Sequence, residues 1–349
     1  MHTSEPRPAE LIRDWGSERF GGVDLPNTAR PEVTRALLIE LVEIGLTRLP
    51  SPGGGHTWAR FEALTALGEI DLTVARLAEA HADAGAILAE LDPDLEPPRD
   101  SRWAVWAAEP RAAGVEASMG PDGVWRLRGR KAWCSGAGAV SHALVTARAA
   151  DGPRLFAVDL SNPLVKPVDD PWPAAALSGT DTRSVDFESA AVTAVGDPND
   201  YVDRAGFWYG AIGVAAVWYG GAYAVGDRLA RDARRRGLGD LADAHLGAVS
   251  AALSSASSVL RQAAWSIDHG DAEKPPFGEI LARAARASVE ASAAAVISHV
   301  GRALGPAPLA LDGTHARRVQ DLELYLRQSH AEADLAELGR RVKDAGLPR

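Results

Sequence analysis

Hydrophobic residues recur at helical spacing in the first third of the chain. One stripe, bounded by a proline before it and a glycine after it, is made by Val33, Leu37, Leu41 and Ile44. Spacings of three and four residues predict an amphipathic helix. The Ala/Leu-rich stretch 61–91 predicts one or two more helices. The segment 92–100, DPDLEPPRD, is too rich in proline and acid to continue a helix, so we expect a boundary there.

The hydrophobic period changes in the middle of the chain. Short segments, several of them alternating between apolar and polar residues, are separated by turn-forming groups of Gly, Pro, Asp and Asn. These segments are 124–127, 143–147, 154–158 and 184–187. The pattern predicts a β-domain.

Helical spacing returns towards the C-terminus. A long stripe, stepping by three and four residues, consists of Leu246, Val249, Leu253, Ala256, Leu260, Ala263 and Ile267. Such a stripe, with many small residues, is typical of helices that pack closely and nearly parallel. We therefore expect an α+β protein with an N-terminal helical domain (1–100), a middle β-domain (101–200) and a C-terminal helical bundle (201–349).

The stretch from Ala205 to Gly226 has no charged side chain and is long enough to be considered as a membrane span. It is rich in Gly, Trp and Tyr, however, whereas membrane helices are dominated by Leu, Ile, Val and Phe. It is better interpreted as a buried helix of a globular core. The first residues, MHTSEPRPAELIRDW, contain no apolar segment of a secretory signal. We expect a cytoplasmic protein without a membrane partner.

Composition narrows the classes of partner. The chain has 349 residues, with 37 Lys and Arg against 47 Asp and Glu, which gives a net charge of −10. This balance argues against binding to nucleic acid or to an anionic membrane. The single Cys134 excludes an internal disulfide and a zinc site built from cysteines. We predict no metal site.

Three segments of the middle block carry a family resemblance: Ala107-Ala-Glu-Pro110, Gly123-Val-Trp-Arg-Leu-Arg-Gly-Arg-Lys-Ala-Trp-Cys-Ser135 and Ser178-Gly-Thr-Asp-Thr-Arg-Ser-Val-Asp-Phe187. They resemble the T-E-P-x-A-G-S, G-x-x-x-x-x-G-x-K-x-W-I-T/S and G-x-R-x-S-x-T-x-x-V-x-F patterns of the acyl-CoA dehydrogenase superfamily. Pro52-Gly-Gly-Gly55 and Arg318-Val-Gln-Asp321 are similar to two further short segments of that family. The resemblance implies N-terminal helices, an antiparallel β-barrel and a C-terminal four-helix bundle.

The resemblance also implies FAD as cofactor. By that similarity, Trp133 would lie against the isoalloxazine ring, Ser135 would hydrogen-bond its N5 edge, and Thr182 would lie near the cofactor. Proteins of the family form homodimers or homotetramers in which a neighbouring subunit holds part of the FAD. The Arg run of Ala233-Arg-Arg-Arg-Gly237 stands where the family has R-x-x-F-G, without the Phe. Arg234 and Arg236 are therefore expected at the pyrophosphate.

The position of the family's catalytic base departs from the pattern. Aligning Asp321 with the family's R-D segment puts Ser329 where dehydrogenases carry Glu, and the alternative position for that Glu falls near Phe207. Neither is a carboxylate, and removal of a proton beside a thioester needs a base. His330 could titrate near neutrality, so Ser329 and His330 are the candidate catalytic residues. If the alignment is shifted by a turn, the nearest carboxylates are Glu323 and Glu332. A second departure is Ala108, which replaces the Thr of T-E-P.

These residues support three hypotheses. The first is an FAD-dependent oxidoreductase that acts on a CH–CH bond of an acyl thioester or a related small molecule, with a possible electron-transfer or reductase partner. The second is a flavin-dependent monooxygenase or oxidase of the same fold, which the missing Glu favours. The third is a non-catalytic pseudo-enzyme subunit.

Overall fold

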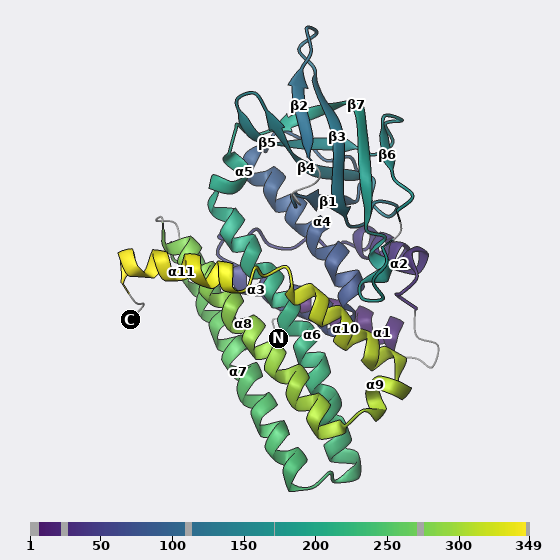
Figure 1. Ribbon diagram of the computed structural model, residues 1–349, viewed down its shortest axis with the longest axis vertical. Helices are drawn as coiled ribbons and strands as arrows, with labels where there is room; N and C mark the ends of the chain where they lie inside the picture. Colours follow the sequence, from purple (N-terminus) through teal and green to yellow (C-terminus); the bar gives the residue numbers. More distant parts are fainter. Residues whose placement is uncertain (1–6, 22–26, 109–113, 171, 271–275, 347–349) are drawn as a thin grey trace, which may run out of the picture.

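The computed structural model describes residues 7–21, 27–108, 114–170, 172–270 and 276–346. Helices come first along the chain, strands follow, and long helices end it (Figure 1). The confirmed fold class is thus α+β, with a helical N-terminal part, a β-barrel and a C-terminal bundle. Glu109 and Pro110 of the first motif lie outside the described residues.

The N-terminal part consists of α1 (Pro8–Phe20), α2 (Pro31–Glu43), α3 (Thr57–Ile70) and α4 (Leu72–Leu91). In α2, Leu37 and Leu41 are buried as the stripe predicts, but Ile44 lies beyond the last helical residue and is exposed. The Ala/Leu-rich stretch forms two helices because the Asp71 side chain accepts hydrogen bonds from the N–H groups of Thr73 and Val74. This capping starts a new helix at that point.

The strands are β1 (Trp103–Trp106), β2 (Val115–Met119), β3 (Trp125–Cys134), β4 (His142–Ala149), β5 (Gly152–Asp159), β6 (Val165–Pro167) and β7 (Arg183–Val195), with a short 3₁₀ helix η1 (Ser178–Thr180) before β7. Strands β4, β2, β3, β7 and β5 pair in that order, and β5 pairs again with β4, so the sheet closes. The pairings are antiparallel except that β4 runs parallel to β1 and β2. In this respect the prediction of an antiparallel barrel needs correcting.

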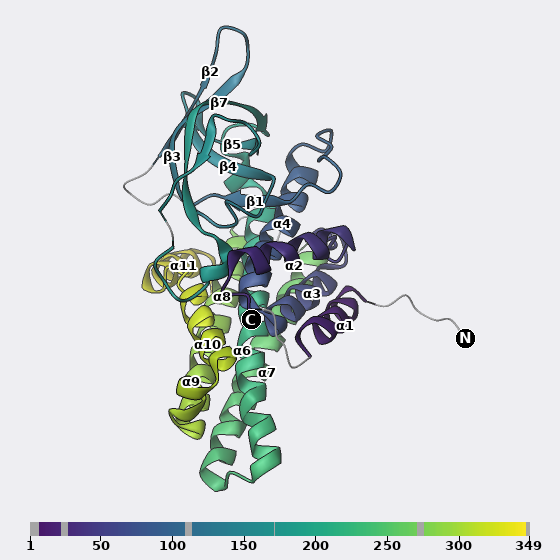
Figure 2. The same cartoon turned by 90° about the vertical axis from the view of Figure 1, so that its right-hand side faces the viewer.

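The C-terminal part consists of α5 (Asp200–Asp203), α6 (Ala205–Arg236), α7 (Asp240–Asp268), α8 (Phe277–Leu304), α9 (Ala307–Leu311), α10 (Gly313–Leu326) and α11 (Glu332–Ala345). Helices α6, α7, α8 and α10 pack as the bundle, and α3 packs on α6 (Figures 1 and 2). Close approach of α3 and α6 depends on glycine: a Cβ at Gly220 would lie 2.1 Å from the Thr65 carbonyl oxygen.

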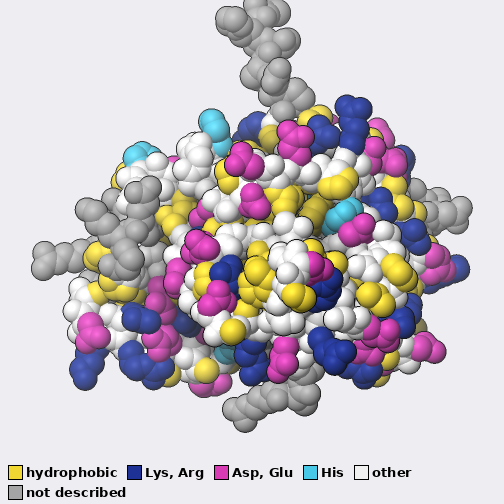
Figure 3. Space-filling view, turned by 90° about the horizontal axis from the view of Figure 1, so that it is seen from above, with side chains coloured by type: hydrophobic (Ala, Val, Ile, Leu, Met, Phe, Trp, Pro, Cys, Tyr) yellow, Lys and Arg dark blue, Asp and Glu magenta, His cyan; other side chains and the backbone are white. Residues whose placement is uncertain are grey.

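The uncharged stretch 205–226 forms the first two-thirds of α6, and most of its residues are buried. None of the described helices combines the length and hydropathy needed to cross a membrane. Seen from above, acidic and basic side chains are intermixed with apolar ones over the β-domain (Figure 3). This face therefore presents no field of a single sign.

Candidate functional site

Strand β3 ends in an irregular stretch that turns one aromatic side chain outward. Its pairing with β7 shifts register between Lys131 and Cys134. Within that shift, Trp133 has a φ of +59° and is 59% exposed. A bulge re-aims side chains, and a bulky residue in the left-handed region is strained unless its surroundings hold it. The next residue, Cys134, is fully buried and fixes the strand end. The backbone thus presents the Trp133 indole as an open aromatic surface.

Two residues after Trp133, Ser135 donates its N–H to the Trp133 carbonyl at 3.0 Å. The Ser135 side chain begins a series of three hydroxyl groups, those of Ser135, Thr182 and Thr180, which we call the hydroxyl row. The Thr182 hydroxyl donates to Ser135 Oγ at 3.0 Å, and the Thr182 and Thr180 oxygens are 2.8 Å apart. At the other end, the Thr180 hydroxyl donates to the Leu177 carbonyl at 2.7 Å. Thr180 and Thr182 are buried, whereas Ser135 is half-buried. The row therefore leads from the interior to a hydroxyl that a ligand can reach.

The backbone around the hydroxyl row is held by further hydrogen bonds. The Trp106 indole N–H donates to the Ser135 carbonyl at 3.0 Å, and the Gly136 N–H donates to the Thr180 carbonyl at 2.7 Å. Leu177 and Asp181, on either side of η1, have φ values of +53° and +47°. Two strained residues flanking one turn persist only where neighbouring contacts determine the conformation.

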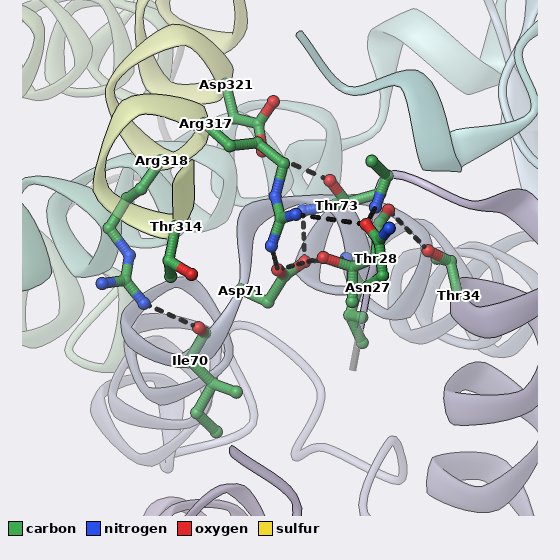
Figure 4. Close-up of polar contacts among 12 residues, drawn as sticks. Asn27, Thr28, Thr34, Ile70, Asp71, Thr73, Thr314, Arg317, Arg318 and Asp321 are labelled. Carbon is green, nitrogen blue, oxygen red and sulfur yellow. Dashed lines mark hydrogen bonds and ion pairs between the residues drawn. The ribbon is translucent and has the colours of Figure 1, made fainter. Parts of the chain in front are cut away.

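One such contact is the carboxylate of Asp321 on α10. It accepts a hydrogen bond from the Leu177 N–H at 2.6 Å and one from the Thr73 hydroxyl at 3.4 Å. Figure 4 shows Asp321 and Thr73 in one network with Asp71. The Asp71 carboxylate accepts a hydrogen bond from the Thr28 hydroxyl at 2.5 Å, and it lies 3.8 Å from the Arg317 guanidinium. Burial raises the pKa of Asp321 to about 6. The network ties α10 to the start of α4 and to η1.

A pocket of about 570 Å³ adjoins the loop that carries Ser135. Its apolar lining includes Trp106, Val140 and Val185, and its polar lining includes Arg102 and His142. Because the Trp106 indole also donates to the Ser135 carbonyl, a ligand in this pocket would contact the same loop.

The helical part contains a second polar site, made of ionisable side chains. Tyr325 on α10 donates its hydroxyl to Glu79 on α4 at 3.2 Å, and Arg76 donates to the same carboxyl at 2.9 Å. One turn further along α4, Asp83 pairs with the fully buried Arg60 of α3 at 2.5 Å. We call these five residues the ionic cluster. Burial, with the neighbouring Asp83 charge, raises the pKa of Glu79 to about 8. Burial thus favours the protonated form of the Glu79 carboxyl.

The sequence reasoning missed the ionic cluster, although a signal was available. Arg76, Glu79 and Asp83 are spaced by three and four residues in a helix otherwise rich in Ala and Leu. Side chains at this spacing share one face of a helix. Charged residues that recur on a single face of an apolar helix indicate that their side chains pair with polar groups of neighbouring helices.

The two candidate catalytic residues lie on opposite sides of the chain between α10 and α11. Ser329 is buried, and its hydroxyl accepts a hydrogen bond from the Ala331 N–H at 3.1 Å. The His330 side chain is 79% exposed, with Nδ1 3.6 Å from Asp334. Within the described residues, no hydrogen bond joins either of them to the hydroxyl row. Their catalytic role stays a prediction.

The alternative base position also holds no carboxylate. Phe207, in the first turn of α6, packs edge-on against Tyr201 and Trp208. Glu323 and Glu332, the carboxylates that an alignment shifted by a turn would select, are both exposed. Glu79 in the ionic cluster and Asp321 on α10 are two carboxyls that are enclosed in this part of the molecule.

The arginines expected at a pyrophosphate lie at the far end of α6, away from the β-domain (Figure 1). The side chains of Arg234 and Arg236 are 68% and 63% exposed, and their partners are Asp227 and Asp232 of the same helix. Ser135 and Thr182 are joined by a hydrogen bond, and the Trp133 backbone contacts Ser135. The two arginines do not join them within one chain.

Comparison with known proteins gives a fold. No protein-family model matches the sequence, and no curated protein matches it. Among solved structures, the chain is similar to butyryl-CoA dehydrogenase from Megasphaera elsdenii (18% identity, TM-score 0.78, covering 97% of this chain and 99% of that one). It is equally similar to the dibenzothiophene monooxygenase TdsC from Paenibacillus sp. A11-2 (18%, 0.76, 97% and 98%).

A third similar structure is KijD3 in complex with FMN and dTDP-3-amino-2,3,6-trideoxy-4-keto-3-methyl-D-glucose (20%, 0.76, 98% and 92%). A structure of TdsC also contains FMN. These likenesses extend over nearly the whole of each chain at low identity. The chain has the acyl-CoA dehydrogenase fold, and the resemblance seen in the sequence motifs is confirmed at that level.

Proposed function

We propose that this chain is a flavin-dependent oxidoreductase. The observation that carries the proposal is Trp133, an exposed aromatic side chain in strained backbone, two residues before Ser135 at the end of the hydroxyl row. An isoalloxazine ring needs an aromatic contact and a hydrogen-bonding group at its edge. When bound, a flavin supplies two-electron redox chemistry. The chain's own residues would pack against the ring through Trp133 and position its N5 edge through Ser135, with Thr182 holding the Ser135 hydroxyl.

The proposed flavin is FAD. The phosphates of FAD would be met by Arg234 and Arg236 of a second copy, because these side chains are exposed at the far end of α6. Arg pairs well with phosphate oxygens. This places the cofactor site in a homodimer or homotetramer. FMN is the second candidate, favoured by its presence in the TdsC and KijD3 structures.

The proposed reaction class is that of a monooxygenase or oxidase, which needs no base beside a thioester. Ser329 and Phe207, the two positions where the resemblance places the base, carry a hydroxyl and a phenyl ring. A separate reductase would be the partner that supplies electrons. The second candidate is CH–CH oxidation of an acyl thioester, with an electron-transfer partner. The observation favouring it is Glu79, an enclosed carboxyl whose raised pKa of about 8 suits a proton-transfer group.

Titration with FAD and FMN, followed by flavin fluorescence, tests the cofactor. We expect Trp133→Ala and Ser135→Ala to weaken flavin binding by about fivefold or more, since stacking and one hydrogen bond are each worth about 1 kcal/mol or more. Trp265→Ala is the matched control, because Trp265 is also about half-exposed but lies on α7. If the wild-type protein binds neither flavin, the non-catalytic subunit becomes the better hypothesis.

Anaerobic mixing of the flavin-loaded protein with short- to long-chain acyl-CoAs separates the two reaction classes. We expect no bleaching of the flavin absorbance, and product formation only with oxygen and a reductase. Bleaching by any acyl-CoA would favour dehydrogenation. In that event, loss of bleaching in Glu79→Gln would assign the proton transfer to the ionic cluster.

A further inference from the structure

The pocket of about 570 Å³ in the β-domain is separate from the proposed flavin site. None of Trp133, Ser135 and Thr182 is among the described residues that line it. Its volume falls within the range of small-molecule pockets, which are mainly apolar and carry a few polar groups. The apolar part of this lining comes from β1, the loop after Ser135 and the paired strands β6 and β7, and includes Trp106, Ala137, Val140, Val165 and Val185.

The polar lining residues lie side by side at one edge of the pocket. Trp103, His142 and Asp159 are register partners across β1, β4 and β5. Arg102 comes directly before Trp103 in the sequence, and its side chain lines the pocket together with those of His142 and Asp159. This polar edge therefore runs from a guanidinium past an imidazole to a carboxylate.

Arg102 brings a positive charge to the polar edge without a carboxylate partner. Its half-buried side chain donates from Nε to the Ala139 carbonyl at 3.1 Å and from Nη1 to the Asp100 carbonyl at 3.4 Å. Among the residues that the structure describes, Arg102 forms no ion pair. A guanidinium has five N–H donors, so several remain for a ligand. The two carbonyls fix the side chain in advance, which lowers the entropy lost on binding.

Asp159 limits how much negative charge a ligand can carry. It is the one acidic residue among the described residues of the lining, it is exposed, and it accepts a hydrogen bond from the Ser161 N–H at 2.8 Å. Burial lowers the pKa of His142, the Asp159 charge opposes this effect, and the Arg102 charge adds to it. His142 is therefore largely neutral at neutral pH. A ligand with a single negative charge fits one cation and one anion better than a phosphate dianion does.

We propose that this pocket binds a small monocarboxylate with an apolar body. The carboxylate would accept hydrogen bonds from the remaining N–H groups of Arg102, a pairing for which the planar guanidinium is well suited. The apolar body would lie against Trp106, Val140 and Val185. The inference goes beyond the proposed function and does not depend on it, because the polar edge and the apolar lining are complete without a flavin.

Isothermal titration of the flavin-free full chain with 2-naphthoate tests the pocket. The neutral 2-naphthamide is the matched compound, since it has the same apolar body without the charge. We expect 2-naphthoate to bind about tenfold or more tightly than 2-naphthamide, because hydrogen bonds to a charged group are stronger than neutral ones. Hexanoate and benzoate extend the test to other apolar bodies. Affinities for 2-naphthoate and 2-naphthamide within about twofold, or no binding of any of the three carboxylates at about 1 mM, would overturn the inference.

Two substitutions at the polar edge should act in opposite directions. Arg102→Met should weaken 2-naphthoate about tenfold or more and leave 2-naphthamide within about twofold. Asp159→Asn keeps an oxygen acceptor for the Ser161 N–H and should strengthen 2-naphthoate about threefold, because an exposed like charge is removed. If Arg102→Met does not fold, the Asp159→Asn result decides, and unchanged or weaker 2-naphthoate binding in that variant would contradict the proposal.

Two controls show where the probe binds. Arg154 is also a half-buried arginine of the β-domain, but it pairs with Asp151 outside the pocket, so Arg154→Met should leave 2-naphthoate affinity unchanged. Trp133→Ala should do the same. A fall in Arg154→Met equal to that in Arg102→Met would mean a general charge effect, and loss of binding in Trp133→Ala would assign the probe to the flavin site. Either result overturns this inference, whereas failure of the wild type to bind FAD or FMN contradicts only the proposed function.

Discussion

The two polar sites of this protein place their groups by different means. At the end of β3, the groups are neutral hydroxyls and an exposed indole, and the backbone is strained at Trp133 and Leu177. In the ionic cluster, the groups are ionisable and enclosed, and Glu79 and its neighbours lie on regular helices. The free-energy cost of the site at the end of β3 comes from strained backbone, and that of the ionic cluster comes from removing ionisable groups from water.

This difference bears on what each site can do. A hydroxyl group can both donate and accept hydrogen bonds, so the hydroxyl row suits an uncharged ligand edge that carries hydrogen-bonding atoms. Buried charges in low-dielectric surroundings resist rearrangement, because any unpaired charge is strongly destabilising. The ionic cluster therefore suits the storage of one proton at Glu79 in a fixed geometry.

Removing Arg60 is the strongest test of the charged side of this comparison. Arg60→Met keeps most of the side-chain length but leaves Asp83 unpaired beside Glu79. We expect a loss of about 3–5 kcal/mol in the free energy of unfolding, typical of breaking an enclosed ion pair from one side. Urea unfolding measures it. Arg7→Met is the control, since Arg7 pairs with Glu10 at the surface, and it should cause no measurable change. Equal stabilities would show that the ionic cluster is solvated.

Glu79→Gln probes the stored proton. In the folded state burial raises the pKa of Glu79 from 4.5 to about 8. The folded chain then binds this proton more tightly than the unfolded chain, so the contribution of Glu79 to stability falls as pH rises through that range. Gln cannot ionise and avoids this loss. Between about pH 5 and pH 7, the stability of the wild type should fall relative to the variant by about 1 kcal/mol per pH unit.

Unfolding measured at several pH values checks this expectation, with the exposed Glu323→Gln as control. If the difference in unfolding free energy between Glu79→Gln and the wild type stays constant with pH, Glu79 is ionised throughout. The ionic cluster would then hold no proton, and this contrast with the hydroxyl row would be wrong.

The fold was largely readable from the sequence because periodicity reports burial directly. The stripe from Leu246 to Ile267 became the buried face of α7, and the uncharged stretch 205–226 became the interior part of α6. Helix α1 was missed, although Ile12 and Trp15 are spaced by three residues and buried. The parallel pairings of β4 were also beyond reach, because strand direction depends on contacts between segments far apart in sequence.

The candidate site was readable only where a motif keeps neighbouring residues together. Trp133 and Ser135 are two residues apart, and the pattern that includes Thr182 links a second segment to them. Asp321 appeared in the sequence as an alignment marker, and its contact with Leu177 depends on how α10 packs against η1. Likewise, the Glu79 carboxyl meets Tyr325 across more than two hundred residues of chain, a distance that local patterns do not bridge.

The smallest expected effect tests the strained side of the comparison. Glycine adopts positive φ without the penalty of a bulky side chain, so Trp133→Gly should release strain at the end of β3. We expect the flavin-free variant to be more stable in urea by about 1 kcal/mol while its flavin affinity falls, as for a residue kept for binding. Ser189→Gly is the control, because Ser189 has a φ of +66° on β7. It should gain stability without losing flavin. If Trp133→Gly is less stable than wild type, packing of the indole contributes more to stability than the backbone strain costs. The end of β3 and the ionic cluster would then both be stabilised by side-chain contacts.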